Sequence, residues 1–283
     1  MKNFILAMRP KTLVAGILPP LATYFYFISK SNERPLWILI LCILGALFIQ
    51  CATNFFNDLI DAKKGADNVR IGPTRVTAAG LVNSKTILKW ALVSLLFATV
   101  VSIPLIMRGG TWIMIPGIIS LYLSYGYTGG PYPLAYKGLG ELFVFIFFGL
   151  FSVLGSYYLF SLEFNKDALI LAVIYGLLTT TLICVNNLRD REQDKIVKKL
   201  TLATKMNHKK YRALLLSLIF IPYLLISLMK NKSLFPLLIP LLFAIKLARI
   251  IITEDGERLN EGLKFSAIHL LIFCLITSYM FIT

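Results

Sequence analysis

The sequence predicts an all-α fold, a multi-pass bundle of transmembrane helices. Hydrophobic residues make up 57% of the 283 residues, and the mean hydropathy is +0.75, which is outside the range of soluble globular chains. Apolar stretches recur along the chain, each close to the ~20 residues that a helix needs to cross a bilayer. Nine spans are expected, at about residues 12–29, 36–54, 86–107, 111–127, 139–160, 167–185, 211–229, 234–250 and 264–282.

The polar segments between these spans support the assignment. Lys2, Arg9 and Lys11 precede the first span and no small-residue cleavage site follows it, so this span is expected to remain in the protein. Pro19-Pro20 predicts a kink within it. Arg108-Gly109-Gly110 separates the third span from the fourth, and the last three spans are mostly aliphatic.

The distribution of basic residues predicts the orientation. Of the 29 Lys and Arg residues, 23 lie in or at the edges of alternate polar segments, counted from the N-terminus, and six lie in the others. The positive-inside rule then places the N-terminus and both Asp-rich segments in the cytoplasm, and the C-terminus outside the cell membrane.

Composition also excludes several classes of function. The net charge of +15 is dispersed among loops, whereas a nucleic-acid-binding protein gathers basic residues on one surface, so no nucleic-acid partner is expected. The four cysteines all fall in apolar spans without CxxC spacing. Neither a disulfide framework nor a thiolate metal site is therefore indicated.

Two stretches carry acidic and amide side chains at the end of an apolar span. If the helix that begins near residue 36 continues past Ala52, a rotation of about 100° per residue places the first set within one arc about 100° wide. The second set emerges from the span 167–185 with the same build. The two sets are Asn54, Asn57, Asp58 and Asp61, and Asn186, Asn187, Asp190 and Asp194.

Carboxylates crowded on a helical face repel one another unless a cation lies between them, so the two faces suggest a shared divalent-metal site. Mg²⁺ takes hard oxygen ligands, often one or two carboxylates completed by water and phosphate, and no EF-hand spacing or soft-ligand cluster occurs. Because the faces recur after about 130 residues and roughly four spans, a weak internal duplication is expected within a single domain of residues 1–283.

Basic residues near these faces predict an anion that bridges the metal, and the best candidate is a diphosphate. Arg70 and Arg75 lie in the long loop after the first face, and Lys137 follows a tyrosine-rich turn. A purely solvated basic loop would also obey the positive-inside rule. Glu141 stands at the head of an otherwise uncharged span, where an ionisable group is a functional candidate, although it could also simply pair with Lys137.

An apolar tail attached to such a diphosphate would occupy a cavity between the helices. Ionisation of an allylic diphosphate leaves a carbocation, which aromatic ring faces stabilise, while metal and cations stabilise the leaving group. The aromatic-rich spans provide such rings.

Four motifs carry a resemblance to a known family. They are RPKTL near the start, NDLIDAKKGAD followed by GPTR, YTGGPYPLAYKGLGELFVFIFFG, and NNLRDREQDK followed by TLA. In this order they resemble the UbiA superfamily of intramembrane aromatic prenyltransferases, and most closely its branch that acts on 1,4-dihydroxy-2-naphthoate. The resemblance covers the chain from about Arg9 to Thr204 and implies nine helices around a cavity open to lipid, under a cytoplasmic cap.

The resemblance also implies roles for individual residues. Lys137 and Tyr132 match a motif near the diphosphate, and Arg75 matches a basic residue after the first Asp motif. Arg9 and Lys11 would meet the carboxylate of the acceptor or would anchor the chain at the membrane. Asp61 and Asp67 are six residues apart where many members have four. The naphthoate branch has a similar spacing, so this difference is interpreted as a marker of the branch, and the resemblance supports a direct role for Asp67 less strongly. The residues expected to bind Mg²⁺ and diphosphate are Asn57, Asp58, Asp61, Asp67, Asn187, Asp190 and Asp194.

The expected reaction is Mg²⁺-dependent transfer of a polyprenyl chain from polyprenyl diphosphate to 1,4-dihydroxy-2-naphthoate, with loss of CO₂, to give demethylmenaquinol. Two alternatives remain at this level: another acceptor ring, such as 4-hydroxybenzoate or homogentisate, and an ion-coupled transporter. Transporters usually hold coupling ions near the bilayer midplane, whereas these carboxylates lie at helix ends. The proton acceptor for the ring is open, with Glu141 or an aspartate as candidates.

Overall fold

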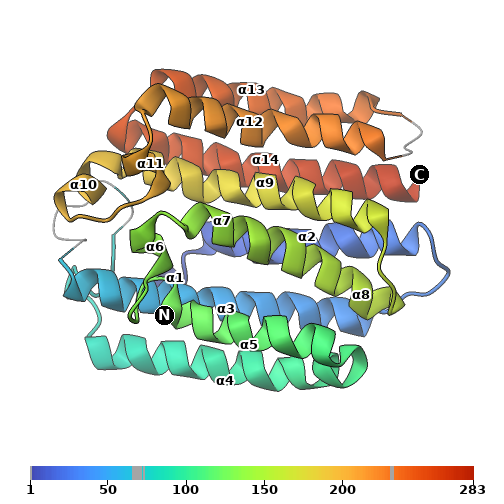
Figure 1. Cartoon of the computed structure of the whole chain (residues 1–283), viewed down its shortest axis with the longest axis horizontal. Coiled ribbons are helices and arrows are strands. Elements are labelled where there is room, and N and C mark those ends of the chain that lie inside the picture. Colours follow the sequence, from blue (N-terminus) through green and yellow to red (C-terminus); the bar gives the residue numbers. More distant parts are fainter. Residues whose placement is uncertain (1, 66–71, 73, 230–232) are drawn as a thin grey trace.

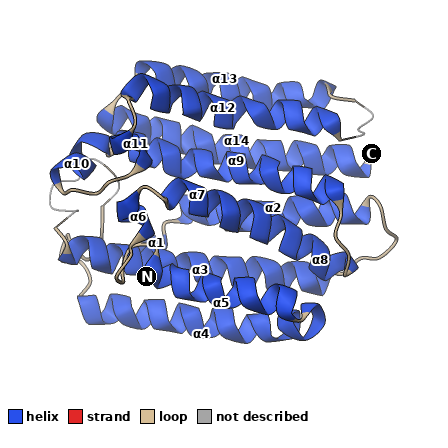
Figure 2. Cartoon of the chain, in the orientation of Figure 1, coloured by secondary structure: helices blue, strands red, loops and turns tan. Residues whose placement is uncertain are grey.

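The computed structural model describes residues 2–65, 72, 74–229 and 233–283, which form helices joined by loops (Figures 1 and 2). No residue in these ranges lies in a strand, which confirms the all-α prediction. The long helices run side by side, from α4 at one edge of the bundle to α13 at the other (Figure 1).

Eight helical segments in the described ranges are long and apolar enough to cross a membrane, and each overlaps a predicted span. One of them combines three consecutive pieces, α7 (Gly140–Val144), the π-helix η1 (Phe145–Leu154) and α8 (Gly155–Ser161). The others are α2 (Pro10–Ile28), α3 (Leu36–Lys63), α4 (Ser84–Gly109), α9 (Lys166–Arg189), α12 (His208–Leu228), α13 (Leu238–Thr253) with the preceding turn η2 (Phe235–Leu237), and α14 (Leu259–Ile282) with the preceding turn η3 (Gly256–Arg258).

The predicted span 111–127 forms a helix that is shorter than the other eight. This helix, α5 (Thr111–Gly126), has 16 residues, below the ~20 that cross a bilayer without tilt or thinning. The count of nine spans is therefore approximate, although all nine predicted segments are helical.

The core of the bundle lies around α9, most of which is buried. This helix packs against α12, α14 and η1, and the first and last long helices, α2 and α14, pack against each other. At the contact between η1 and α9, a Cβ added to Gly149 would lie 2.6 Å from both the Ala172 carbonyl oxygen and the Gly176 Cα, so only glycine permits this approach. Such close contacts between small residues stabilise helix pairs in membranes.

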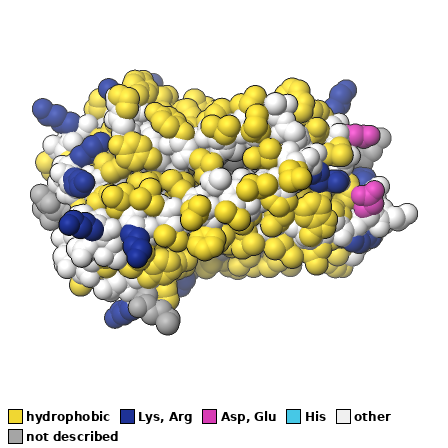
Figure 3. Space-filling view, turned by 90° about the horizontal axis from the view of Figure 1, so that it is seen from below, with side chains coloured by type: hydrophobic (Ala, Val, Ile, Leu, Met, Phe, Trp, Pro, Cys, Tyr) yellow, Lys and Arg dark blue, Asp and Glu magenta, His cyan; other side chains and the backbone are white. Residues whose placement is uncertain are grey.

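Short helices gather at one end of the bundle, which we call the polar end. They are α6 (Leu134–Lys137), α10 (Arg191–Ile196) and α11 (Leu202–Lys205), at the left of Figure 1. Figure 3 shows hydrophobic side chains over the middle of one face and Lys and Arg side chains concentrated at this end. That distribution is typical of a helical bundle that crosses a bilayer.

The helical path is interrupted at two positions that belong to predicted site segments, Arg9 and Asp190. Arg9 separates α1 (Lys2–Met8) from α2 and adopts a left-handed conformation with φ 54°. Pro10, which has no N–H and disfavours a helical residue before it, starts the new helix. The second break is at Asp190, with φ −88° and ψ 4°, so the second acidic stretch is divided between α9 and α10 instead of continuing as one helix.

Candidate active site

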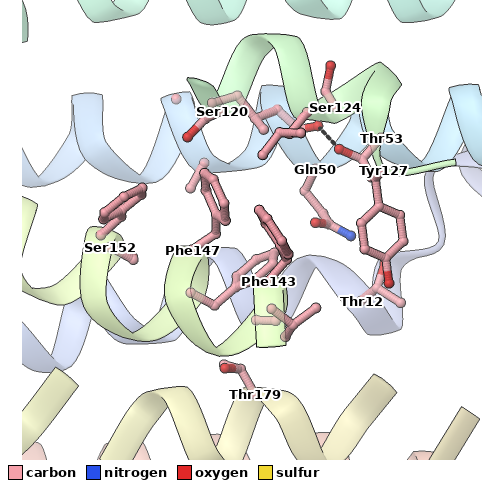
Figure 4. A pocket seen from close by; sticks show the side chains of 18 of the residues that line it. Thr12, Gln50, Thr53, Ser120, Ser124, Tyr127, Phe143, Phe147, Ser152 and Thr179 are labelled. Atoms are coloured by element: carbon pink, nitrogen blue, oxygen red, sulfur yellow. Dashed lines mark hydrogen bonds between the residues drawn. The ribbon is translucent and has the colours of Figure 1, made fainter. Parts of the chain in front are cut away.

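A large cavity lies between the helices, with a volume of ≈ 970 Å³. Its wall is mostly apolar and aromatic, and most of it comes from α2, α3, α4, α5, α7, η1, α8 and α9. Figure 4 shows Phe143 and Phe147 on one side of it, with small polar side chains such as Thr12 and Thr53 near one end. A cavity of this size and composition suits a long apolar ligand.

A small polar pocket lies against the polar end of this cavity. Its volume is ≈ 70 Å³, and its wall contains Asp61, Arg75, Asn187 and Lys199. The two cavities are lined in common by Arg9, Asn57, Tyr127, Ile183 and Asn186. A ligand with a polar head and an apolar tail would therefore have its head and tail in adjoining spaces.

The first acidic stretch lies on α3, as predicted, but its members make different contacts. Asp61 is buried; its Oδ1 accepts a hydrogen bond from the Tyr136 hydroxyl (2.8 Å), and its Oδ2 lies 3.3 Å from the Arg75 guanidinium. Asn57 accepts a hydrogen bond from the Thr128 hydroxyl through Oδ1. Both side chains line the polar pocket.

Asp58 does not line the pocket, because its carboxylate accepts hydrogen bonds from backbone N–H groups of the segment after the long loop. Its Oδ1 accepts the backbone N–H of Thr77 (2.9 Å), and its Oδ2 accepts that of Val76 (3.2 Å). The side chain is 1% exposed and lines neither cavity. Asp58 thus attaches the segment after the long loop to α3.

The second acidic stretch is held by a buried arginine and a buried glutamate. Arg189 Nε and Nη2 each lie 2.7 Å from one oxygen of Asp190, and Nη2 also donates to Asn186. Asn187 donates from Nδ2 to Glu141 Oε1 at 2.9 Å. Asn186 and Asn187 line the polar pocket, so both acidic stretches reach the same space.

Asp194 lies in α10, close to carboxylates of both stretches. Its Oδ1 is 3.7 Å from Lys199 Nζ, and its buried Oδ2 has no hydrogen-bond partner among the described residues. Burial raises the pKa of Asp194 to about 7; Lys199 opposes this rise, whereas Asp190 and Asp61 add to it. A buried carboxylate oxygen without a donor, beside other carboxylates, is the setting in which a cation binds.

Comparisons with known proteins identify the family. The sequence profile of the UbiA prenyltransferase family matches residues 17–276. The chain belongs to this family. It is a multi-pass membrane protein and a membrane-embedded aromatic prenyltransferase.

Curated relatives agree with this assignment, and solved structures share the fold. The 1,4-dihydroxy-2-naphthoate octaprenyltransferase of Haemophilus influenzae is 34% identical over 261 residues, covering 83% of this chain and 81% of the relative; that of Mycobacterium leprae is 32% identical over 219 residues, covering 76% and 74%. A UbiA homolog from Archaeoglobus fulgidus, solved with DMAPP and Mg²⁺, superimposes with a TM-score of 0.66 at 17% identity, covering 99% of each chain. One from Aeropyrum pernix gives 0.70 at 12% identity, covering 93% of this chain and 96% of the other.

The cations in and near the polar pocket differ in part from those predicted from the sequence. Arg75 and Lys199 line the polar pocket, and Lys64 Nζ lies 3.9 Å from the centroid of the Tyr136 ring. Burial lowers the pKa of Lys64, which counters the raising effect of Asp61. Lys64 and Lys199 were not predicted as site residues because each belongs to a run of basic residues, and charge alone does not distinguish one member of such a run from another. Tyr136 and Tyr127 were not predicted either, because they lie among several other tyrosines in the same segment.

Several predicted residues lie away from the two cavities. Lys137 and Tyr132 are exposed, with Lys137 Nζ 5.5 Å from the Tyr132 ring centroid, and neither lines a cavity. Glu141 is buried behind Asn187 and also lines neither. Asp67 and Arg70 lie outside the described residues.

Arg9 and Lys11, the candidate acceptor residues, do lie at the cavities. Arg9 lines both of them, and Lys11 lines the large one. The left-handed conformation of Arg9 between two helices places its side chain at the boundary between the polar and the apolar space. The alternative role, anchoring at the membrane surface, does not require a position at both cavities.

The oxygens at the polar pocket fit Mg²⁺ better than an ion that needs a complete protein cage. Within the described ranges, no group of three or more His, Cys, Asp or Glu side chains is arranged to hold a metal ion. Asn57, Asp61 and Asn187 instead offer a few hard oxygen atoms in the wall of the pocket. Asp190 and Asp194 do not line it, but Asp194 contacts Lys199, which does, and its buried Oδ2 lacks a donor among the described residues. Mg²⁺ commonly takes one or two carboxylates and completes its shell with water and phosphate.

Proposed function

We propose that this prenyltransferase transfers a polyprenyl group from polyprenyl diphosphate to 1,4-dihydroxy-2-naphthoate, with loss of CO₂ and diphosphate, to give demethylmenaquinol for menaquinone synthesis. The observation that carries the proposal is the polar pocket, lined by Asp61, Arg75 and Lys199, against the end of a ≈ 970 Å³ apolar cavity. The relatives named for the same reaction, at up to 34% identity, support this choice of acceptor.

The polar pocket is proposed to hold the diphosphate and Mg²⁺. Arg75 would bind phosphate oxygens through its guanidinium and Lys199 through its ammonium group. The residues proposed to hold Mg²⁺ are Asn57, Asp61, Asn187 and Asp194, and the ion, when bound, supplies positive charge to stabilise the leaving diphosphate. The solved relative with DMAPP and Mg²⁺ supports a divalent ion in this fold.

The large cavity is proposed to hold the prenyl chain along a row of three rings. Phe143, Phe147 and Phe151 are spaced by four residues, with ring centroids 5.9 Å and 5.0 Å apart, and all three line the cavity. Their π-faces stabilise positive charge that develops on the allylic carbon when its bond to the diphosphate oxygen breaks. The apolar wall also excludes water, which would otherwise trap that cation as an alcohol.

Arg9 is proposed to orient the acceptor through its carboxylate. A guanidinium binds a carboxylate in a planar, bidentate arrangement, and Arg9 lies where the two cavities meet. The ring carbon next to the carboxylate-bearing carbon then forms the new carbon–carbon bond and loses its proton, and the diphosphate leaves with the electrons of the broken C–O bond. The carboxylate leaves as CO₂, and the carbon that carried it takes up one proton.

We also propose an orientation of the chain in the membrane and an internal duplication. The polar end is proposed to face the cytoplasm, with the N-terminus on that side and the C-terminus outside the cell membrane, because basic residues concentrate at that end on the face drawn in Figure 3. Residues 1–283 are proposed to form one domain in which α3 and α9 are the equivalent helices of a weak duplication. Each of them brings amide side chains to the polar pocket.

The proposal is tested with purified protein in detergent, octaprenyl diphosphate, Mg²⁺ and a panel of acceptors, with products read by mass spectrometry. A Mg²⁺-dependent prenylated quinol, with labelled CO₂ released from the naphthoate carboxyl group, is expected. Product from 4-hydroxybenzoate or homogentisate but not from the naphthoate would overturn the choice of acceptor. Ion transport in proteoliposomes without any prenyl transfer would overturn the enzymatic proposal.

A further inference from the structure

Glu141 is a buried glutamate that the proposed reaction does not use. It is 5% exposed, at the start of the segment that continues into η1. Its Oε1 accepts two hydrogen bonds, from Asn187 Nδ2 (2.9 Å) and from the Tyr211 hydroxyl (3.1 Å). Its Oε2 is buried and has no partner among the described residues. A buried carboxyl group is costly, so its retention calls for an explanation.

The position of Glu141 excludes direct contact with a ligand in either cavity. Gly140, the residue before it, lines the polar pocket, and so does Asn187, whereas the Glu141 side chain lines neither space. A proton acceptor must reach the proton that it removes, either directly or through one water. An effect of Glu141 on the site would therefore have to pass through a residue that lines the pocket, and Asn187 is hydrogen-bonded to it.

The hydrogen bond from Asn187 determines which end of its amide faces the pocket. An asparagine side chain has a donor end, Nδ2, and an acceptor end, Oδ1, that differ little in shape. Because the donor end is bound to Glu141 Oε1, the acceptor end is left for the pocket, and no described residue donates to it. Rotation of the amide by 180° would place two acceptor oxygens against each other and turn an N–H₂ group towards the cation site.

We propose that Glu141 is a positioning residue: it holds the amide of Asn187 so that Oδ1 faces the polar pocket as a ligand for a divalent cation. The inference rests on the proposed function, because it assigns Asn187 to the metal–diphosphate site. Groups that orient a metal ligand in this way typically contribute about 10- to 100-fold to metal affinity.

Tyr211 provides the matched control. Its hydroxyl donates to the same Oε1, but it also lies 3.2 Å from the Cys184 carbonyl oxygen, so it has a second acceptor when Glu141 changes. Tyr211→Phe removes the other hydrogen bond to Glu141 and leaves the contact with Asn187. Loss of metal affinity in Glu141→Met but not in Tyr211→Phe separates orientation of Asn187 from a general effect of disturbing this buried group.

The test measures Mn²⁺ binding by electron paramagnetic resonance, on full-length protein with farnesyl thiolodiphosphate, an unreactive analogue of the donor. Glu141→Met is expected to raise the Mn²⁺ dissociation constant about 10- to 100-fold. Glu141→Gln, which keeps an acceptor oxygen, is expected to lose less, and Tyr211→Phe to stay within about twofold of the wild type. In turnover assays the Met variant is expected to recover part of its kcat at high Mg²⁺, which a simple packing defect would not do.

A second pair of variants tests the same idea if Glu141→Met does not fold. Asn187→Asp alone places two carboxyl groups against each other and is expected to weaken Mn²⁺ binding. Adding Glu141→Gln restores a donor opposite the new carboxylate and is expected to recover most of the affinity. No recovery in the double variant, or wild-type affinity in Glu141→Met, overturns the inference. Absence of Mn²⁺ binding in the wild type overturns the proposed metal site and this inference together. Normal Mn²⁺ binding in the wild type with wild-type affinity in Glu141→Met overturns this inference alone.

Discussion

Asp58 and Asp61 are one helical turn apart on α3, and we expect their substitutions to fail in different ways. Asp58 accepts two backbone N–H groups, from Val76 and Thr77, in a buried position. Hydrogen bonds to a charged group contribute about 1.5–3 kcal/mol each. Asp58→Asn keeps one acceptor oxygen, so it should cost about 1.5–3 kcal/mol, and Asp58→Ala, which keeps none, about twice that.

Asp61 is expected to behave in the opposite way. Its oxygens face Arg75 and Tyr136 in the polar pocket. Asp61→Asn keeps its size and one acceptor oxygen while it removes the negative charge that a divalent cation needs. We therefore expect activity to fall by at least about 100-fold, comparable to other losses of transition-state charge stabilisation.

Thermal unfolding in detergent, followed by tryptophan fluorescence, and Mg²⁺-dependent turnover separate the two effects. A loss of 1.5–3 kcal/mol corresponds to a fall in the melting temperature of about 3–12 °C for Asp58→Asn, from about 2–4 °C per kcal/mol in chains of this size. The surviving folded fraction should retain its affinity for Mg²⁺. If Asp58→Asn instead melts like the wild type and needs far more Mg²⁺, Asp58 is a metal ligand and the structural assignment is wrong.

Four further outcomes are expected. Arg75→Ala should raise the KM for the prenyl diphosphate about 10- to 100-fold through loss of one charge-assisted hydrogen bond, and an unchanged KM would remove it from the diphosphate site. Lys137→Ala should change turnover less than about threefold, because the side chain is exposed and away from both cavities. Phe147→Ala should raise the KM of a long-chain donor more than that of dimethylallyl diphosphate, as steady-state kinetics would show. Because Asp194, with a pKa of about 7, must lose its proton to bind a cation, Mg²⁺ affinity should fall as pH drops below about 7, by up to about tenfold per unit, and Asp194→Asn should abolish this dependence.

Much of the fold follows from hydropathy because burial in lipid requires long apolar helices. The predicted acidic face depended on the helix continuing past Ala52, and α3 does continue through Asp61. The break at Asp190, the left-handed Arg9 and the ten-residue π-helix η1 were not predicted. They depend on local hydrogen bonding and on the contact of Gly149 with α9, neither of which has a periodic signal in the sequence.

The predicted site residues show the same limit. Spacing along a helix predicts that Asn57, Asp58 and Asp61 share a face, but a face about 100° wide includes both the pocket and the neighbouring loop. Which of these carboxylates accepts backbone N–H groups depends on where Val76 and Thr77 pack against α3, and they pack at Asp58. Likewise, the pairing of Asn187 with Glu141 joins residues 46 positions apart and becomes visible only when α7 packs against α9.

The adjacency of the two cavities restricts where the chemistry can take place. A diphosphate does not lie in the apolar cavity, because burial of its charge without cations costs too much free energy. A prenyl chain would gain no hydrophobic stabilisation in the polar pocket. If the polar pocket holds the diphosphate and the large cavity holds the prenyl chain, the bond that breaks lies at their boundary, among Arg9, Asn57, Tyr127 and Asn186. The acceptor has to reach the same place with its carboxylate on the polar side. Arg9 is the cation that lines both spaces among the described residues, so the residue that separates α1 from α2 is the one best placed to align the two substrates.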